Sequence, residues 1–537
     1  MNRRSNLALL ALILILIVLG CAKKGSITGG PKDETPPVFI KALPPNLSTN
    51  FDKKEIRIYF DEYIKLKDPQ KQIIISPPMD PKPNITPLGV ASKYVKIEFT
   101  DTLLENTTYS INFGESIVDN NEENPYPFFR YVFTTGDFLD SLKIKGTIAD
   151  AIQKEPDSYI TVALYEVDEN YSDSIVYKDV PRYITNTLDT ISFDMYNIKE
   201  GEYKLVALKD ASSNYIYNPK QDKIGFLEET ISLPKDTAKV FNIKLFKEIL
   251  DFKALKPKQV SKNEIIFPYE GEADSMKIKM LSQVPDDFKT TIFPDKETDT
   301  LHYLFKPFFE TDSLVFEITN KKNYRDTLIA RIKDQYQDSL VVTSSIQSTL
   351  NPEENFSFSA LTVIDSINKS LISLTDKDTL DVPFSIKTNR IKNETELEFE
   401  KTESNSYSLQ FLPEALKDFI GNTNDTIQFS FRTTKLTDYG TIFLTLENVE
   451  EYPVIVQITN EKEEVITEKI SKQQETLVFK NLNAAKYYIR VVFDSNDNGK
   501  WDTGNFLKGI QPENIKYLTE PIDVRANWEI KQTFILE

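Results

Sequence analysis

The 537-residue sequence contains a single cysteine and a single histidine. One cysteine excludes an intramolecular disulfide, so an exported chain of this length has to be stabilised by packing in large modules. With His302 as its one histidine, the chain cannot form a multi-His metal site and has a single candidate for a His-based triad. The sequence also lacks a Gly-rich phosphate loop, a nucleophile elbow and a metalloprotease helix motif. We therefore predict a protein that is not an enzyme.

Clusters of lysine and arginine are also lacking, and acidic residues dominate the charge. The formal net charge is −18 and the pI is near 4.9. Such a chain repels phosphate backbones, so we expect no nucleic-acid partner. Hydrophobic residues make up 40% of the chain and charged residues 27%, which is ordinary for folded domains. The length suits roughly four or five modules of about 100 residues each.

Residues 7–19 form the one long apolar run, which follows Arg3 and Arg4 and has the length of a signal-peptide core. The run ends in Val18-Leu19-Gly20-Cys21, which resembles the lipobox of bacterial lipoproteins. That resemblance implies that residues 1–20 are a signal peptide and that Cys21 is lipidated, for example with palmitate. A short anchor helix is the alternative, although a membrane span needs about 20 apolar residues. Residues 21–36 are rich in Gly, Pro and charge, and predict a flexible tether.

From residue 37 onward the main pattern is alternation of apolar and polar residues. Val95, Ile97 and Phe99 alternate with polar residues, and similar runs occur at 56–60 and 160–164. This period of two predicts half-buried strands, and the turns between them indicate stacked β-sandwiches. The single helix that we expect is a turn or two at 412–418. The predicted fold class is therefore all-β.

The chain also repeats itself. One pattern occurs in two copies. The first copy is Tyr109 to Phe113 followed by Phe133-Thr134-Thr135, and the second is Tyr407 to Phe411 followed by Phe431-Arg432-Thr433-Thr434. A second module type follows each copy, opening on Gly146-Thr147-Ile148 and on Gly440-Thr441-Ile442. We therefore divide the chain into 37–137 (A), 141–247 (B), a β-sandwich of unassigned type at 248–345, 346–436 (second A, degenerate) and 438–537 (second B).

The first A module opens with Pro36-Pro37-Val38 and closes with Phe133-Thr134-Thr135-Gly136, which resembles the bacterial Ig-like domain of surface-layer proteins. The B modules resemble prealbumin-like or carboxypeptidase-regulatory-like β-sandwiches. With the lipobox, the whole chain is similar to the Ig-like-domain lipoproteins common in Bacteroidota. The resemblance implies a scaffold or binding role. The second A copy lacks the Pro-Pro opening.

The sharpest local motif begins at Asp494. The motif matches the first nine positions of a calcium loop. Oxygen ligands are available from Asp494 (position 1), Asn496 (3), Asn498 (5), the carbonyl of Lys500 (7) and Asp502 (9), and Gly499 stands at position 6. The motif departs from that loop at position 12, where Asn505 replaces the bidentate Glu, and a strand leads in where an EF-hand has a helix. Calcium is therefore one interpretation. The other is a turn whose Asn and Asp side chains bond their own backbone. The first B copy keeps Asp210 and Asn214 but has Tyr215 at the Gly position.

Asp followed by Ser or Thr and then an aliphatic or similar residue occurs thirteen times. This resembles the O-glycosylation sequon of exported Bacteroidota proteins. It also suits the turn-to-strand transitions of any β-sandwich, and both interpretations are open. In eleven of the thirteen the third residue is Leu or Ile, and the acceptor hydroxyls that the resemblance implies there are those of Thr102, Ser141, Ser174, Thr190, Thr300, Ser313, Thr327, Ser339, Ser366, Thr379 and Thr426.

The leading function hypothesis is a non-catalytic, lipid-anchored scaffold, spacer or adhesion protein of the outer membrane, an acidic rod fixed at one end by Cys21. Its expected partners are the membrane, other envelope proteins and glycans. The alternatives are a calcium-dependent or carbohydrate-binding surface protein, with Trp501 and Trp528 as candidate stacking residues, and an envelope enzyme with an unrecognised site. The sequence leaves open whether the protein faces the periplasm or the cell surface.

Overall fold

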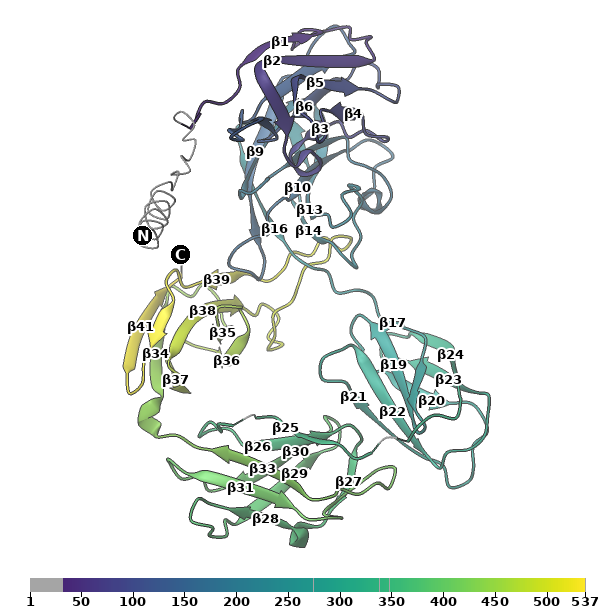
Figure 1. The fold of residues 1–537 in the computed structure, drawn as a ribbon, viewed down its shortest axis with the longest axis vertical. Coiled ribbons are helices and arrows are strands. Elements are labelled where there is room, and N and C mark those ends of the chain that lie inside the picture. Colours follow the sequence, from purple (N-terminus) through teal and green to yellow (C-terminus); the bar gives the residue numbers. More distant parts are fainter. Residues whose placement is uncertain (1–31, 274, 338, 347, 537) are drawn as a thin grey trace, which may run out of the picture. The chain divides into compact units, whose positions relative to one another are not determined.

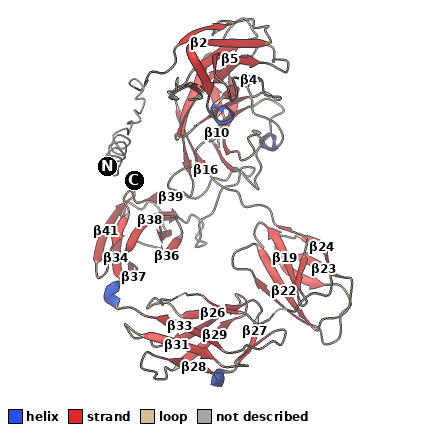
Figure 2. Ribbon diagram, in the orientation of Figure 1, coloured by secondary structure: helices blue, strands red, loops and turns tan. Residues whose placement is uncertain are grey.

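The computed structural model describes residues 32–536 except 274, 338 and 347 (Figure 1). Strands dominate this part of the chain, and its helical elements are short (Figure 2). These elements are α2 (Pro69–Gln72), η1 (Asp173–Tyr177), η2 (Lys369–Leu371) and η3 (Leu436–Asp438). Among the described residues, no helix is both long enough and apolar enough to cross a membrane. The all-β prediction is confirmed.

The chain divides into two compact units. The first comprises residues up to 143 together with 183–188 and 196–199, and the second comprises the rest. In the first unit, one sheet has the order β1-β2-β5-β4 with β7 on β2, and the other has the order β3-β6-β8. Their strands are β1 (Phe39–Leu43), β2 (Glu55–Leu66), β3 (Ile74–Ser76), β4 (Asn84–Thr86), β5 (Ser92–Glu98), β6 (Thr108–Asn112), β7 (Ile117–Asp119) and β8 (Arg130–Thr134).

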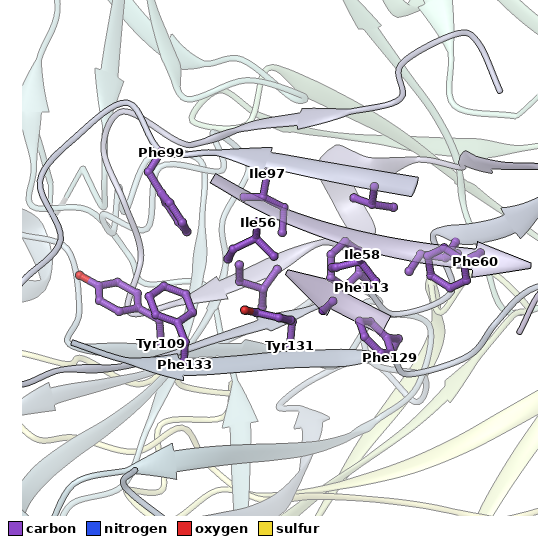
Figure 3. Packing of buried hydrophobic residues seen from close by; sticks show 14 of the residues in the cluster. Ile56, Ile58, Phe60, Ile97, Phe99, Tyr109, Phe113, Phe129, Tyr131 and Phe133 are labelled. Carbon is purple, nitrogen blue, oxygen red and sulfur yellow. The ribbon is translucent and has the colours of Figure 1, made fainter. Parts of the chain in front are cut away.

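The two sheets of the first unit enclose a core rich in aromatic rings (Figure 3). Ile56, Ile58 and Phe60 alternate along β2 and are buried, as the period of two predicts. Within the second sheet, Phe133 of β8 and Tyr109 of β6 are a cross-strand pair whose rings stack with centroids 5.3 Å apart. The sandwich is therefore held by alternating apolar side chains, as half-buried strands require.

The repeat of the A module is visible in its hydrogen bonds. Tyr407 and Phe431 face each other across two strands, as Tyr109 and Phe133 do, with ring centroids 5.6 Å apart. The Tyr109 hydroxyl accepts the N–H of the residue five positions earlier at 2.9 Å, and the Tyr407 hydroxyl does the same at 2.8 Å. Residues 298 positions apart thus occupy equivalent places in two sandwiches, and the sequence repeat has a structural counterpart.

The two B copies also share a topology. In each copy, the first strand pairs in parallel with the last, β9 with β16 and β34 with β41. The order β10-β13-β14 in the first copy matches β35-β38-β39 in the second. The strands of the first copy are β9 (Leu142–Asp150), β10 (Thr161–Glu166), β11 (Tyr183–Asn186), β12 (Ser192–Ile198), β13 (Gly201–Lys209), β14 (Lys223–Phe226), β15 (Ile231–Leu233) and β16 (Val240–Leu245). Those of the second are β34 (Gly440–Glu447), β35 (Val454–Thr459), β36 (Val465–Ser471), β37 (Thr476–Leu482), β38 (Ala485–Phe493), β39 (Ile515–Tyr517), β40 (Ile522–Val524) and β41 (Glu529–Ile535).

Two further groups of sheets lie between the B copies. The earlier group has its own hydrophobic cluster and consists of β17 (Lys253–Ala254), β18 (Lys258–Ser261), β19 (Glu264–Glu270), β20 (Lys277–Met280), β21 (Lys289–Pro294), β22 (Thr300–Lys306), β23 (Ser313–Thr319) and β24 (Arg325–Arg331). The later group consists of β25 (Val342–Ser344), β26 (Phe356–Ala360), β27 (Ile364–Ile367), β28 (Ile372–Thr375), β29 (Phe384–Asn389), β30 (Glu394–Phe399), β31 (Ser406–Phe411), β32 (Leu416–Asp418) and β33 (Ile427–Arg432).

Two local predictions are wrong. The helix expected at 412–418 is absent, because Leu416–Asp418 forms β32 and pairs with β27. The Asn424 side chain also accepts the N–H of Leu416, so tertiary contacts satisfy the backbone that a helix would have used. The run at 160–164 is a strand but is not half-buried, because residues 161–165 of β10 are all buried and both faces are covered.

Candidate functional site

The Asp494 loop follows β38, the strand that was expected to lead into it. The Asp494 side chain is 1% exposed and accepts the backbone N–H of Asn498 at 3.0 Å through Oδ1 and that of Gly499 at 2.8 Å through Oδ2. Gly499 has a φ of +78°, in the left-handed region that favours glycine. The buried carboxylate therefore closes the turn on its own backbone.

The other predicted ligand residues are partly brought together. The side-chain amides of Asn496 and Asn498 donate to Oδ2 of Asp502 at 2.6 and 2.5 Å. Lys500 points its ammonium at Glu272, 3.0 Å away, and lies 3.6 Å from Oδ1 of Asp502. The hydrogen bond to Glu272 raises the pKa of Lys500. A cation already lies beside Asp502, which weakens the site for a second one.

Glu513 also belongs to this loop, and it was not predicted from the sequence. Its Oε1 accepts the N–H and the hydroxyl of Ser495, each at 2.7 Å, and its Oε2 accepts the N–H of Asp502 at 3.0 Å. Asn505, at the position of the calcium-binding Glu, instead exchanges backbone hydrogen bonds with Ile510. No fixed spacing links a residue 19 positions after Asp494 to a calcium loop, so only the fold could place Glu513 here.

The first B copy has the same turn without the same side chains. Asp210 accepts the N–H of Ser212 at 3.0 Å and that of Tyr215 at 2.7 Å. Tyr215 has a φ of 63° where Gly499 has 78°, and Ser213 has a φ of 53° where Asp497 has 54°. The first B copy thus adopts a similar turn with Ser212 and Asn218 in the places of Asn496 and Asp502.

The donor set fits calcium only in part. Calcium takes six to eight oxygen ligands, including a bidentate carboxylate in the loop type that the sequence suggests. The carboxylates of Asp494 and Glu513 already accept backbone N–H groups. Within the described residues, no group of three or more His, Cys, Asp or Glu side chains is placed to hold a metal ion. Calcium binding at this loop stays a prediction, and the N–H donors supply a complete alternative account of the turn.

The two tryptophans do not form one platform. Trp501 lies beyond the carboxyl end of β38 and donates its indole N–H to the Glu513 carbonyl at 3.1 Å. Trp528 follows β40, which pairs with the opposite end of β38. A nine-residue strand is about 27 Å long, so the two rings cannot stack on one sugar. Trp528 is half exposed and lies beneath the Arg525 guanidinium, 5.0 Å from its ring centre.

His302 lies in β22 between two carboxylates. Its Nδ1 contacts Oε1 of Glu264, and its Nε2 lies 3.1 Å from Oδ2 of Asp295. Burial lowers the pKa of His302, but the hydrogen bonds to both carboxylates outweigh it, so the pKa is raised. The imidazole stacks on Phe293 at a centroid distance of 4.7 Å. This geometry makes His302 a structural link between β19, β22 and the residue that follows β21.

The acceptor hydroxyls of the Asp-Ser/Thr repeats differ in exposure. Thr300 is buried, and Ser174 and Ser313 are half-buried. Exposed residues are Thr102, Ser141, Thr190, Thr327, Ser339, Ser366, Thr379 and Thr426. A folded-state modification of Thr300 is therefore disfavoured, while glycosylation of the exposed residues stays a prediction. Cys21 and the predicted signal peptide, residues 1–20, lie outside the described residues.

With the fold and these loops in place, the chain can be compared with known proteins. Residues 33–135 match the family model of the bacterial Ig-like domain. The Ig-like prediction for 37–137 is confirmed. The match covers about a fifth of the chain, so the other modules and the lipoprotein family remain predictions. None of the curated proteins matches the chain.

Several solved structures of bacterial proteins match the chain. A Bacteroides ovatus protein, SGBP-B of a mixed-linkage glucan utilization locus in complex with a heptasaccharide, is 12% identical over 71% of this chain and 93% of its own, with a TM-score of 0.19. The major pilin subunit of Bacillus cereus is 11% identical over 74% and 99%, with a TM-score of 0.14. An Escherichia coli adhesin is 7% identical over 62% and 94%, with a TM-score of 0.15. At these values the likeness carries no argument about function.

Proposed function

We propose that this chain is a non-catalytic, lipid-anchored envelope protein whose β-sandwich modules serve as scaffold, spacer or adhesion surfaces. The observation that carries the proposal is the Ig-like domain at 33–135 within a chain built of β-sandwiches. Sandwiches of this kind present loops and sheet faces to partners on a stable framework. Other envelope proteins and glycans are the partners that we expect.

The side chains that could carry chemistry support this proposal by what they contact. Asp494 and Glu513 hold backbone N–H groups, and His302 joins Glu264 of β19 to Asp295, which follows β21. Each of these groups thus has structural contacts that fix its position. Polar contacts of this kind stabilise a loop or a sheet.

The anchor part of the proposal rests on the resemblance of residues 18–21 to a lipobox. It places the protein at the outer membrane, on a face that the sequence leaves open. Protease treatment of intact and of permeabilised cells distinguishes the two faces. Cleavage of the modules in intact cells indicates the cell surface, and cleavage only after permeabilisation indicates the periplasm.

Partner binding is tested with a membrane-impermeant amine-reactive crosslinker on cells that produce the full chain with a C-terminal affinity tag. We expect discrete crosslinked species with the native chain and their loss in the Cys21→Ala variant, which is not anchored. A broad hydrolase screen of the purified chain is the counter-test. Turnover of any substrate there would contradict the non-catalytic proposal.

A second candidate, a calcium-dependent binding surface, is favoured by the convergence of Asn496 and Asn498 on Asp502. Turning the two amides would direct two more oxygens at the same point, at the cost of the bonds that these oxygens now accept from the backbone N–H groups of Asn498 and Lys500. The thermal midpoint of the full chain in calcium and in chelator tests it. If the thermal midpoint is the same in calcium and in chelator, this candidate function is excluded.

A further inference from the structure

The last B copy is longer than the first at one place. Twelve residues separate Asp210 from β14, whereas twenty separate Asp494 from β39. The additional residues form a small hairpin in which Asn505 and Ile510 exchange backbone hydrogen bonds of 2.8 and 2.9 Å. Gly509, at a φ of +63°, allows the tight return. We call residues 503–511 the clasp.

The clasp inserts one aromatic side chain into the first B copy. Phe506 is 1% exposed, although its neighbour Leu507 is 56% exposed. The Phe506 ring packs edge-on against Phe226 at 5.1 Å and lies 6.4 Å from the ring of Tyr177. The residues that receive it lie more than 250 positions earlier in the chain. A buried phenylalanine on an otherwise exposed hairpin is an anchor that fills a pocket.

A buried carboxylate completes this pocket. Glu248 is 8% exposed, and its Oε1 accepts the backbone N–H of Phe506 at 2.7 Å while its Oε2 accepts the Tyr217 hydroxyl at 2.8 Å. Burial, followed by the charge of Glu248, raises the pKa of Tyr217, which therefore stays a donor. Without the clasp, this carboxylate would lose one of its donors, which is costly for a buried charge. We call Tyr177, Tyr217, Phe226, Phe246 and Glu248 the socket.

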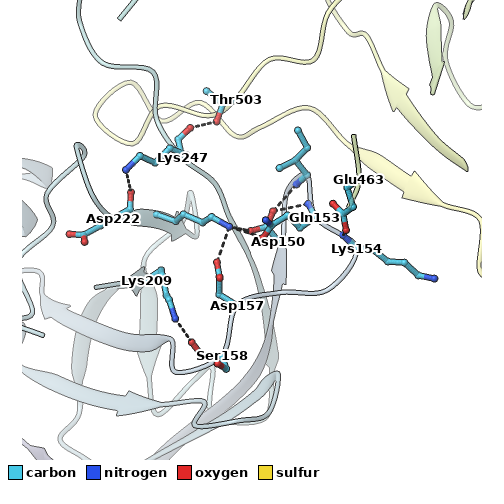
Figure 4. Close-up of polar contacts among 12 residues, drawn as sticks. Asp150, Gln153, Lys154, Asp157, Ser158, Lys209, Asp222, Lys247, Glu463 and Thr503 are labelled. Carbon is cyan, nitrogen blue, oxygen red and sulfur yellow. Dashed lines mark hydrogen bonds and ion pairs between the residues drawn. The ribbon is translucent and has the colours of Figure 1, made fainter. Parts of the chain in front are cut away.

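Contacts on both sides of Phe506 fix the approach of the clasp. The Thr503 hydroxyl donates to the carbonyl of Lys247 at 2.7 Å (Figure 4), and the Gln511 amide donates to the carbonyl of Phe226 at 3.0 Å. Gly504 lies so close that a Cβ there would be 2.7 Å from the ring of Phe246. The fit requires glycine at this position because any side chain would push the clasp away.

A second set of contacts joins the same two modules. The buried Arg490 and the Tyr517 hydroxyl both donate to the carbonyl of Ile152. The backbone N–H of Lys154 donates to Glu463 at 3.0 Å (Figure 4). Its ammonium donates to the carbonyl of Thr519 at 2.9 Å. A rod of modules that contact only their sequence neighbours does not predict any of these bonds.

We infer that the socket is a specific binding site for a hairpin-borne phenylalanine with a free backbone N–H, and that the clasp of the same chain is its occupant. The clasp holds the last B copy on the first, so residues 249–439 form a closed loop between two docked modules. The hairpin is preorganised by its own hydrogen bonds, which reduces the entropy cost of docking. The connection rests on this anchor, on the hydrogen bonds beside it and on the contacts of Arg490, Tyr517 and Lys154.

Hydrogen exchange followed by mass spectrometry on the full chain tests this inference. We compare the native chain with Phe506→Ala, and use Leu507→Ala as the matched control because Leu507 lies next to the anchor and is exposed. Loss of the anchor should raise exchange by at least about tenfold in peptides that cover 171–180 and 214–228. Leu507→Ala and peptides from 33–135 should match the native chain. Unchanged exchange at the socket in Phe506→Ala overturns the inference.

A variant on the socket side keeps the test decisive if Phe506→Ala loosens its own module. Glu248→Ala should raise exchange in the clasp while β35 and β38 of the last B copy stay protected, because only docking links the two places. Clasp exchange equal to that of the native chain would overturn the inference. A synthetic peptide of residues 502–514 added to Phe506→Ala should restore protection at the socket, and the same peptide with alanine for phenylalanine should not. Restoration by both peptides would contradict the assigned specificity.

Discussion

The turn after β38 offers a sharp test of what holds it together. Asp494→Ala removes a carboxylate that is 1% exposed and accepts two backbone N–H groups at 3.0 and 2.8 Å. Hydrogen bonds to a charged group contribute about 1.5–3 kcal/mol each, and part of that sum is returned because the buried charge is removed as well. We therefore expect the turn to lose about 2–4 kcal/mol of local stability. Asp210→Ala is the matched variant in the first B copy and should cost about 1–3 kcal/mol, because Asp210 is less buried.

Hydrogen exchange of peptides that span each turn measures this loss, since a chain of several modules does not unfold in one transition. Both variants are measured in calcium and in chelator. If N–H donors hold the turn, the cost of Asp494→Ala is the same in both solutions. If Asp494→Ala lowers local stability only in calcium, while the effect of Asp210→Ala is the same in both solutions, this reasoning is refuted and a calcium site is supported.

Three further predictions follow from single contacts. The folded pKa of His302 is raised, so the stability that His302 contributes is fully present below the unfolded pKa of about 6.5 and is lost as pH rises through the folded pKa. Urea unfolding of β19–β22 should therefore show that the native chain is more stable than His302→Gln at about pH 6, and that the two are equally stable at high pH. Phe133→Ala and its counterpart Phe431→Ala should each destabilise their own module by about 3–5 kcal/mol, which exchange within each module measures; a loss confined to one copy would contradict the structural repeat. If the Asp-Ser/Thr repeats are glycosylated, glycopeptide mass spectrometry should detect sugar at exposed acceptors such as Thr102 and Thr426, and sugar on the buried Thr300 would contradict the folded-state argument.

Much of the strand pattern could be predicted because it is local. The alternation around Ile56 and Ile97 predicts which face of each strand is buried, and the repeated Tyr109 and Phe133 pair predicts a repeated sandwich. The run at 160–164 misled for a physical reason. Its strand carries apolar side chains on both faces because a second layer covers it, and alternation alone does not reveal a second layer.

The candidate site was less accessible from the sequence. The spacing from Asp494 to Asp502 indicated a polar loop, but whether its oxygens face a cation or backbone N–H groups depends on the folded backbone. Glu513 and the clasp contact were not predicted, because both bring together residues with no shared periodicity. Phe506 is one phenylalanine among 34, and only the packing around it distinguishes it.

The measurement that tests the proposed role most directly is the attachment of Cys21. Cells that produce the full chain or Cys21→Ala are labelled with a palmitate analogue and fractionated. We expect label and outer-membrane recovery for the native chain, and an unlabelled, released chain for the variant. Membrane retention of Cys21→Ala, or a native chain that carries no lipid, would contradict the anchored scaffold.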